Sequence, residues 1–97
     1  MTAPYLGNPK RTIEVLQKYD FVFQKKFGQN FLIDTHVLDK IISAAEITKE
    51  DFVLEIGPGI GTMTQYLACA AREVVAVEID KALIPILEDT LQDYSNV

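Results

Sequence analysis

The sequence predicts an α/β fold, an incomplete parallel sheet with flanking helices. Two short apolar runs, at residues 52–56 and 74–78, have the length and composition of buried strands. A helix is predicted between them, from Gly61 to about Ala71. A strand, a helix and a second strand at this spacing form a crossover unit that joins parallel strands.

A helix is also predicted near the start of the chain. Asn8 can accept hydrogen bonds at a helix N-terminus, and Pro9 suits the first helical position. This helix should run to about Tyr19, with Ile13 and Leu16 facing inward.

Two further helices flank the strands. Asp34 or Thr35 can cap the first, which should pack on the sheet through an apolar stripe. The stripe consists of Val37, Leu38, Ile41, Ile42 and Ala45. The second should run from Lys81 to about Tyr94, with Pro85 in or just after its opening turn.

A glycine-rich turn follows the first predicted strand. Gly57, Gly59 and Gly61 alternate with other residues, and glycine lets a ligand approach the backbone closely. Glu78 lies twenty-one residues after Gly57, at the end of the second predicted strand. A carboxylate at about this distance holds ribose hydroxyls in α/β cofactor sites. The pair therefore predicts a nucleotide-like cofactor.

The charge near this turn indicates which cofactor. The dinucleotide fingerprint would place its third glycine at position 62, where Thr62 stands. Glu55 and Glu78 flank the turn, whereas a pyrophosphate prefers a positive helix N-terminus. We therefore predict a cationic cofactor, S-adenosyl-L-methionine, with Glu78 on the ribose. Glu55 should order the turn or balance the charge of the ligand. An NAD- or nucleotide-binding module without methyl transfer, and a structural fragment that binds nothing, remain alternatives.

Composition indicates a globular protein. Apolar residues make up 48% and charged residues 24% of the 97 residues, which argues against intrinsic disorder. The longest apolar runs are far shorter than the roughly 20 residues that span a bilayer, and a single cysteine, Cys69, fits a reducing compartment. We therefore expect a cytoplasmic protein without a metal site.

The net charge of −5 is unevenly distributed. Residues 1–27 hold five basic and two acidic side chains, a net charge of +3, and the remainder has a net charge of −8. A basic edge beside an acidic pocket would suit a polyanion and a cationic cofactor. On charge alone, a solvated helix face is the simpler explanation of the basic residues.

Three segments of the sequence carry a family resemblance: KKFGQNFL at residues 25–32, EIGPGIG at 55–61 and EID at 78–80. Together they closely resemble the ribosomal RNA small subunit adenine dimethyltransferases of the KsgA/RsmA family. The resemblance implies the N-terminal part of a Rossmann-like, S-adenosylmethionine-dependent methyltransferase fold. Residues 1–24 would be a basic N-terminal helical extension. Residues 25–97 would be the N-terminal portion of the cofactor-binding domain.

The resemblance also implies roles for individual residues. Asn30 and Leu32 would contact the methionine end of the cofactor, Gln29 would shape the pocket and Ile79 would pack on adenine. Together with the reasoning from the turn, the predicted cofactor-binding residues are Gln29, Asn30, Leu32, Glu55, Gly57, Gly59, Gly61, Glu78 and Ile79.

The family's catalytic Asn-Leu-Pro-Tyr motif and its C-terminal RNA-binding domain do not occur in these 97 residues. We therefore expect no catalytic residue in this chain and no methyl transfer by it alone. The parent would methylate N6 of two adjacent adenines in small-subunit (16S) rRNA, acting on a pre-30S ribosomal particle. Contacts with the phosphates of this rRNA would come from Lys10, Arg11, Lys25 and Lys26. His36 is expected at the surface or in a helix cap.

Overall fold

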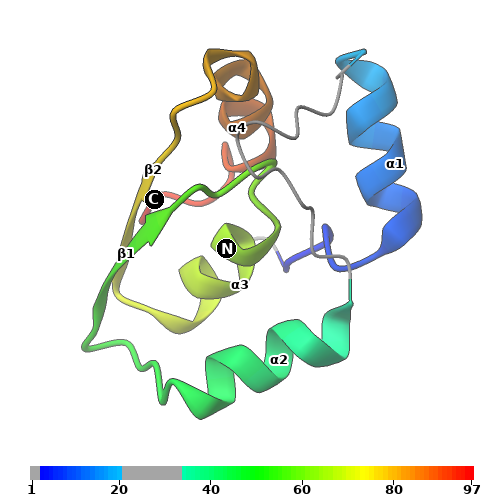
Figure 1. Cartoon of the computed structure of the whole chain (residues 1–97). Helices are drawn as coiled ribbons and strands as arrows, with labels where there is room; N and C mark the ends of the chain where they lie inside the picture. The colour runs from blue at the N-terminus through cyan, green and yellow to red at the C-terminus, as the bar shows by residue number, and fades with distance from the viewer. Residues whose placement is uncertain (1–2, 21–33) are drawn as a thin grey trace.

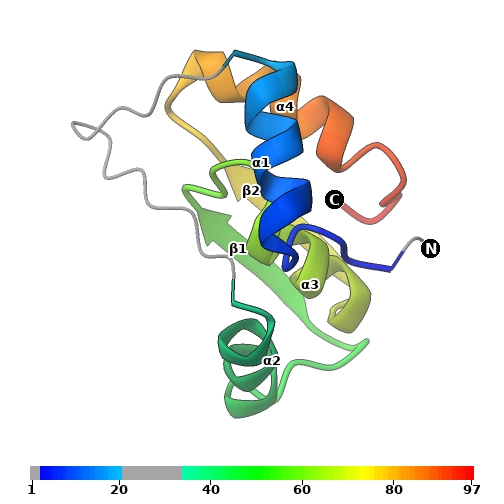
Figure 2. The same cartoon turned by 90° about the vertical axis from the view of Figure 1, so that its right-hand side faces the viewer.

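The computed structural model describes residues 3–20 and 34–97. Two strands lie on one side of this structure, α3 packs beside them, and α1 lies beyond α3 (Figures 1 and 2). The elements, in chain order, are α1 (Pro9–Lys18), α2 (Thr35–Ala44), β1 (Phe52–Ile56), α3 (Thr62–Ala70), β2 (Glu73–Val77), the 3-10 turn η2 (Lys81–Leu83) and α4 (Ile84–Thr90). The domain boundary predicted between residues 24 and 25 falls outside the described residues.

The two strands pair in parallel, as the sequence predicts. Val53 lies opposite Val74 and Ile56 opposite Val77, so both strands end at the same edge. The Gly57 N–H donates to the Val77 carbonyl at 2.8 Å and extends the pairing into the turn. The first strand has its predicted bounds, and the second begins and ends one residue earlier than predicted. The α/β fold with a parallel sheet is therefore confirmed.

Helix α1 begins as predicted, but its buried side differs. The Asn8 side chain accepts from the Lys10 N–H at 2.9 Å, and Pro9 opens the helix. The prediction that Ile13 faces inward is wrong, because its side chain is 53% exposed. Thr12 is buried instead, since its hydroxyl donates to the Leu6 carbonyl at 3.0 Å. The chain before the helix thus supplies a polar partner that periodicity alone did not indicate.

Helix α2 packs chiefly on another helix. Asp34 caps it, and His36 is exposed next to this cap, as predicted. The helix packs mainly against α3 rather than on the sheet (Figure 1), which corrects the prediction. Within the predicted stripe Leu38 is fully buried, whereas Val37 and Ile41 are exposed. Contact with α3 therefore buries Leu38 but leaves Val37 and Ile41 exposed to solvent.

Two apolar clusters hold the elements together. One lies between α3 and the strands, with Leu67, Ala71 and Val74 buried at its centre. The other joins the N-terminal segment to the glycine turn and α4. Its buried members are Leu6, Ile60, Leu83, Ile86 and Leu87. The last helix opens with the 3-10 turn η2 and ends at Thr90, four residues before the predicted end, with Pro85 in its first turn as predicted.

The described residues leave one face of the sheet open (Figure 1). The side chains that alternate onto it are large and at least half exposed, as expected for a sheet with one face open. They are Phe52, Leu54, Ile56, Val75 and Val77. Beside β2 and α4 there is also an apolar groove of about 460 Å³, whose lining includes Val75, Leu87 and Leu91. No helix in the described ranges is long and apolar enough to cross a membrane.

Candidate cofactor site

The glycine turn joins β1 to α3 at the carboxyl edge of the sheet. Gly57, Gly59 and Gly61 have φ values of +72°, +62° and +95°. These values lie in the left-handed region that side chains with a Cβ adopt at a cost. The turn closes through the Gly61 N–H, which donates to the Pro58 carbonyl at 2.9 Å. The residue type at these positions is therefore set first by backbone shape.

The space around two of these glycines differs. A Cβ on Gly57 would meet no atom within 4 Å, so a ligand has room to lie against this backbone. A Cβ on Gly61 would lie 2.9 Å from the Thr90 hydroxyl and 3.2 Å from Leu91 Cδ2. Gly61 therefore allows α4 to pack against the turn. A contact between Gly61 and the cofactor stays a prediction.

Glu78 lies at the turn, where its spacing places it. One carboxylate oxygen accepts from the Gly59 N–H at 3.1 Å, and the other accepts from the Asp80 N–H at 3.0 Å. A carboxylate has about four acceptor positions, so about two remain for other donors. The two backbone amides also fix the side chain next to the open space beside Gly57. Its position and free acceptors suit the two hydroxyls of a ribose.

Glu55 points into the protein instead of into the space beside Gly57. It lies on β1, on the sheet face that α3 covers, and accepts a hydrogen bond from the Thr64 hydroxyl. Burial raises the pKa of Glu55, the Thr64 hydrogen bond lowers it, and the negative charge of Glu78 raises it. The side chain thus joins β1 to α3 and adds negative potential near the turn.

The residue after Glu78 is available for contact. Ile79 is 76% exposed, so its side chain is accessible for packing against an aromatic ring. Asp80 is buried and caps η2, since its carboxylate accepts from the Ala82 N–H at 2.9 Å. The chain that follows the site therefore turns sharply into α4.

Gln29, Asn30 and Leu32 lie outside the described residues, as do Lys25 and Lys26. Their predicted roles stay predictions. In the described ranges, no group of three or more His, Cys, Asp or Glu side chains could hold a metal ion.

The basic residues of α1 differ in their surroundings. Lys10 is exposed, and Arg11 lies 4.6 Å from the centroid of the Tyr5 ring. The Arg11 guanidinium also pairs with Glu14 at 3.5 Å. Lys18 pairs with Asp89 of α4 at 2.7 Å. Lys18 therefore joins α1 to α4 within the protein, and Lys10 is the basic residue most open to a partner.

Sequence reasoning missed three polar side chains that support the turn. Thr64 and Gln65 on α3 are fully buried, and Thr90 on α4 is 2% exposed. Their signal is a polar residue at a position where helical periodicity requires an apolar one. That signal was present, but a sequence does not give the partners of such side chains.

Comparison with known proteins gives the family. The profile described as ribosomal RNA adenine dimethylase matches residues 20–97. Ribosomal RNA small subunit methyltransferase A of Lachnoclostridium phytofermentans is 80% identical over 94 residues, which are 96% of this chain and 32% of that protein. The chain thus spans about a third of the curated relatives that it matches.

Two solved structures share the fold. The 23S rRNA methyltransferase ErmE is 40% identical, with a TM-score of 0.64 over 69% of this chain and 28% of that chain. A dimethyladenosine transferase from Plasmodium falciparum is 39% identical, with a TM-score of 0.62 over 69% of this chain and 26% of that chain. With the profile match over most of its length, the chain belongs to the ribosomal RNA adenine dimethylase family.

Proposed function

We propose that this chain is the N-terminal, cofactor-binding part of an rRNA adenine N6,N6-dimethyltransferase that uses S-adenosylmethionine. The observation that carries the proposal is the Glu78 carboxylate, which two backbone amides hold at the open side of the glycine turn. The match to proteins named ribosomal RNA small subunit methyltransferase A favours small-subunit rRNA as the substrate.

The charge of the site supports this cofactor over a dinucleotide. Glu78 would accept hydrogen bonds from the ribose hydroxyls, and Glu55 would add negative potential behind the turn. Gly57 would lie against the ligand, and Ile79 would pack on the adenine. A pyrophosphate would meet two carboxylates here, which disfavours its binding. When bound, S-adenosylmethionine supplies an already activated methyl group, so the protein contributes mostly binding and positioning.

The remaining roles follow from family membership. Gln29, Asn30 and Leu32 would complete the pocket at the methionine end. Lys10, Arg11, Lys25 and Lys26 would contact rRNA phosphates in a pre-30S particle, which would place the protein in the cytoplasm. The 97 residues alone would bind cofactor without transferring methyl groups to the two adjacent adenines.

Calorimetric titration tests the proposal. S-adenosylmethionine and S-adenosylhomocysteine should bind, and NAD should not. Glu78→Gln removes the negative charge and should weaken binding by about tenfold to a hundredfold, because a hydrogen bond to a charged group contributes about 1.5–3 kcal/mol. The matched control is Glu73→Gln, an exposed glutamate at the other end of β2.

The outcomes separate the candidates. An NAD preference would establish the nucleotide-binding module instead. Equal affinity of the Glu78→Gln and Glu73→Gln variants would remove Glu78 from the site. Thermal melting of each variant should show that both remain folded at the titration temperature.

A further inference from the structure

We propose that residues 3–20 are a positioning element for the glycine turn and act through Gln65 and Thr90. The inference rests on the proposed cofactor site and extends it to a segment that does not itself touch the ligand. It follows from a continuous chain of hydrogen bonds between the N-terminal segment and the turn.

The last link of this chain holds the turn itself. The Thr90 hydroxyl donates to the Ile60 carbonyl at 2.8 Å, and both residues are buried. Ile60 follows Gly59, whose N–H donates to Glu78. The position of Ile60 therefore affects where the Gly59 amide and the Glu78 carboxylate meet, which is the contact that supports the cofactor site.

Gln65 joins Thr90 to the start of the chain. Its amide nitrogen donates to the Thr90 carbonyl at 2.8 Å, and its oxygen accepts from the Tyr5 and Leu6 N–H groups, both at 3.1 Å. Gln65 and Leu6 are fully buried. Loss of one partner would leave buried polar groups without a hydrogen bond, which costs more than the bond contributed. The network thus favours one arrangement of the N-terminal segment relative to α3 and α4.

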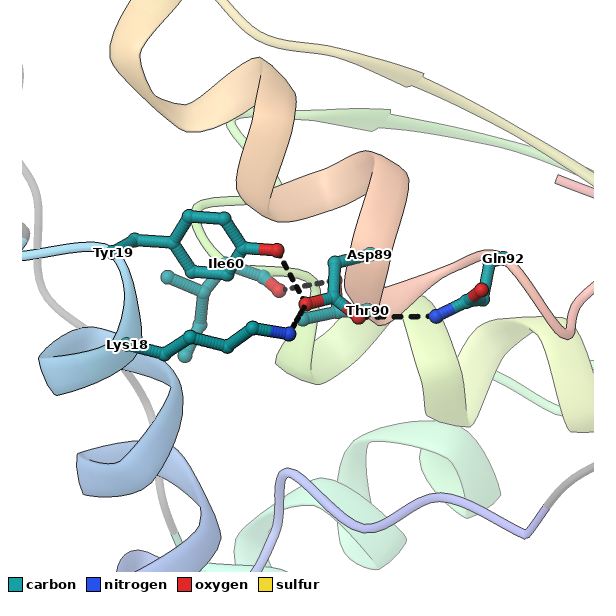
Figure 3. A network of polar contacts seen from close by, with 6 residues as sticks. All are labelled: Lys18, Tyr19, Ile60, Asp89, Thr90 and Gln92. Carbon is teal, nitrogen blue, oxygen red and sulfur yellow. Dashed lines mark hydrogen bonds and ion pairs between the residues drawn. The ribbon is translucent and has the colours of Figure 1, made fainter.

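A second contact ties the far end of α1 to the same helix (Figure 3). Lys18 and the Tyr19 hydroxyl both donate to one carboxylate oxygen of Asp89, which adjoins Thr90 on α4. Gln92 donates to the other oxygen of Asp89 at 3.0 Å. Figure 3 shows Lys18 and Tyr19 reaching Asp89 beside the Thr90–Ile60 contact. The N-terminal segment therefore holds α4 at two points, one buried and one at the surface.

Thr90→Val tests the buried link, because it keeps the side-chain shape and removes the hydroxyl. In the intact protein that carries these residues, Thr90→Val should weaken S-adenosylhomocysteine binding about fivefold to tenfold, since a neutral buried acceptor loses its partner. Thr90→Ser restores the donor and should bind within about twofold of the wild type. KM for S-adenosylmethionine should rise with little change in kcat.

A double substitution tests the surface contact, and it keeps the inference testable if the Thr90→Val variant does not fold. Lys18→Met with Tyr19→Phe keeps the apolar stems, removes both donors to Asp89 and should weaken binding about twofold to threefold, as expected for an exposed contact. Gln17→Met on the same helix is the control, because Gln17 is exposed.

The results separate this inference from the proposed function. Wild-type binding with unchanged affinity in the Lys18→Met, Tyr19→Phe double variant would overturn the positioning role and leave the cofactor site intact. A lower melting temperature of Thr90→Val with an unchanged dissociation constant would do the same, since it would indicate packing alone. Failure of the wild type to bind either ligand would overturn both proposals.

Discussion

Glu55 and Glu78 lie close enough to interact, yet their surroundings give them different tasks. Glu78 is held by two backbone amides next to open space, whereas Glu55 is partly buried behind the turn and bonded to Thr64. The sequence predicted both residues as part of the site because both are acidic and lie near the glycine turn. Burial separates them: the Glu78 carboxylate borders the open space proposed for a ligand, and the Glu55 carboxylate supports the strand and its helix.

Glu55→Gln should stabilise the protein at neutral pH. Burial raises the pKa of Glu55 in the folded state, so the favourable contribution of its neutral form is present below the unfolded pKa and is lost as pH rises through the folded pKa. At pH 7 an uncharged amide avoids the cost of the buried charge. The melting temperature should rise by a few degrees.

Melting curves of both proteins between about pH 4 and pH 8 check this prediction. The difference in melting temperature should shrink as pH falls, because the wild-type side chain then becomes neutral. Thr64→Val is the companion variant and should destabilise the protein at pH 7, since it removes the donor to Glu55. A lower melting temperature for Glu55→Gln at pH 7 would mean that the charge favours folding.

The spacing of Gly57 and Glu78 was sufficient to predict that Glu78 lies at the glycine turn, where it accepts from the Gly59 N–H. Two parallel strands of known length end at one edge, so the residues that follow them lie together. The support from Thr64, Gln65 and Thr90 was not predictable in the same way. Their hydrogen bonds connect segments 9 to 60 residues apart, and a local pattern gives no information about such pairs.

At the scale of elements, the glycine turn has two sides with different functions. Gly57 borders open space, and Gly61 borders α4. Both have positive φ, so alanine at either position carries a backbone cost of about 1–2 kcal/mol. Of these two positions, Gly61 is the one where a Cβ would also collide with neighbouring atoms.

Gly61→Ala should therefore cost about 2–5 kcal/mol of unfolding free energy, since about 1–3 kcal/mol of overpacking adds to the backbone cost. Gly57→Ala should cost about 1–2 kcal/mol but weaken cofactor binding more than its loss of stability explains. Urea unfolding gives the first quantity and calorimetry the second. Equal loss of stability in the two variants would show that α4 does not pack against Gly61.

Element starts were more predictable than element faces. Asn8, Pro9 and Asp34 mark helix starts because capping uses residues close in sequence. The inward faces of α1 and α2 were partly wrong because they depend on partners elsewhere. In α1, Thr12 is buried because its hydroxyl bonds to the Leu6 carbonyl, and Ile13 is exposed. Helix α2 packs mainly on α3, although a contact with the sheet was predicted.

At the scale of the whole molecule, the described residues cover the sheet on one face only. Helix α3 lies on one face of the two strands, and the other face presents apolar side chains to solvent (Figure 1). The apolar runs predicted strands buried on both faces. The described part of the chain covers one face, and the chain spans about a third of the length of its curated relatives.

Two places within residues 3–20 and 34–97 deserve comparison as candidate ligand sites. One is the turn with Gly57 and Glu78, and the other is the apolar groove beside β2 and α4. The groove is lined mostly by apolar side chains, whereas the polar groups suited to a ribose lie at the turn. The central claim is that a cofactor binds at the turn.

Amide chemical shifts during titration with S-adenosylhomocysteine test this claim most directly. The N–H signals of Gly57, Gly59 and Asp80 should move most, because these groups border the proposed ligand or donate to Glu78. The signals of Val75 and Leu91 in the groove should stay nearly fixed. Shifts concentrated at Val75 and Leu91, with Gly57 and Gly59 unchanged, would contradict the account.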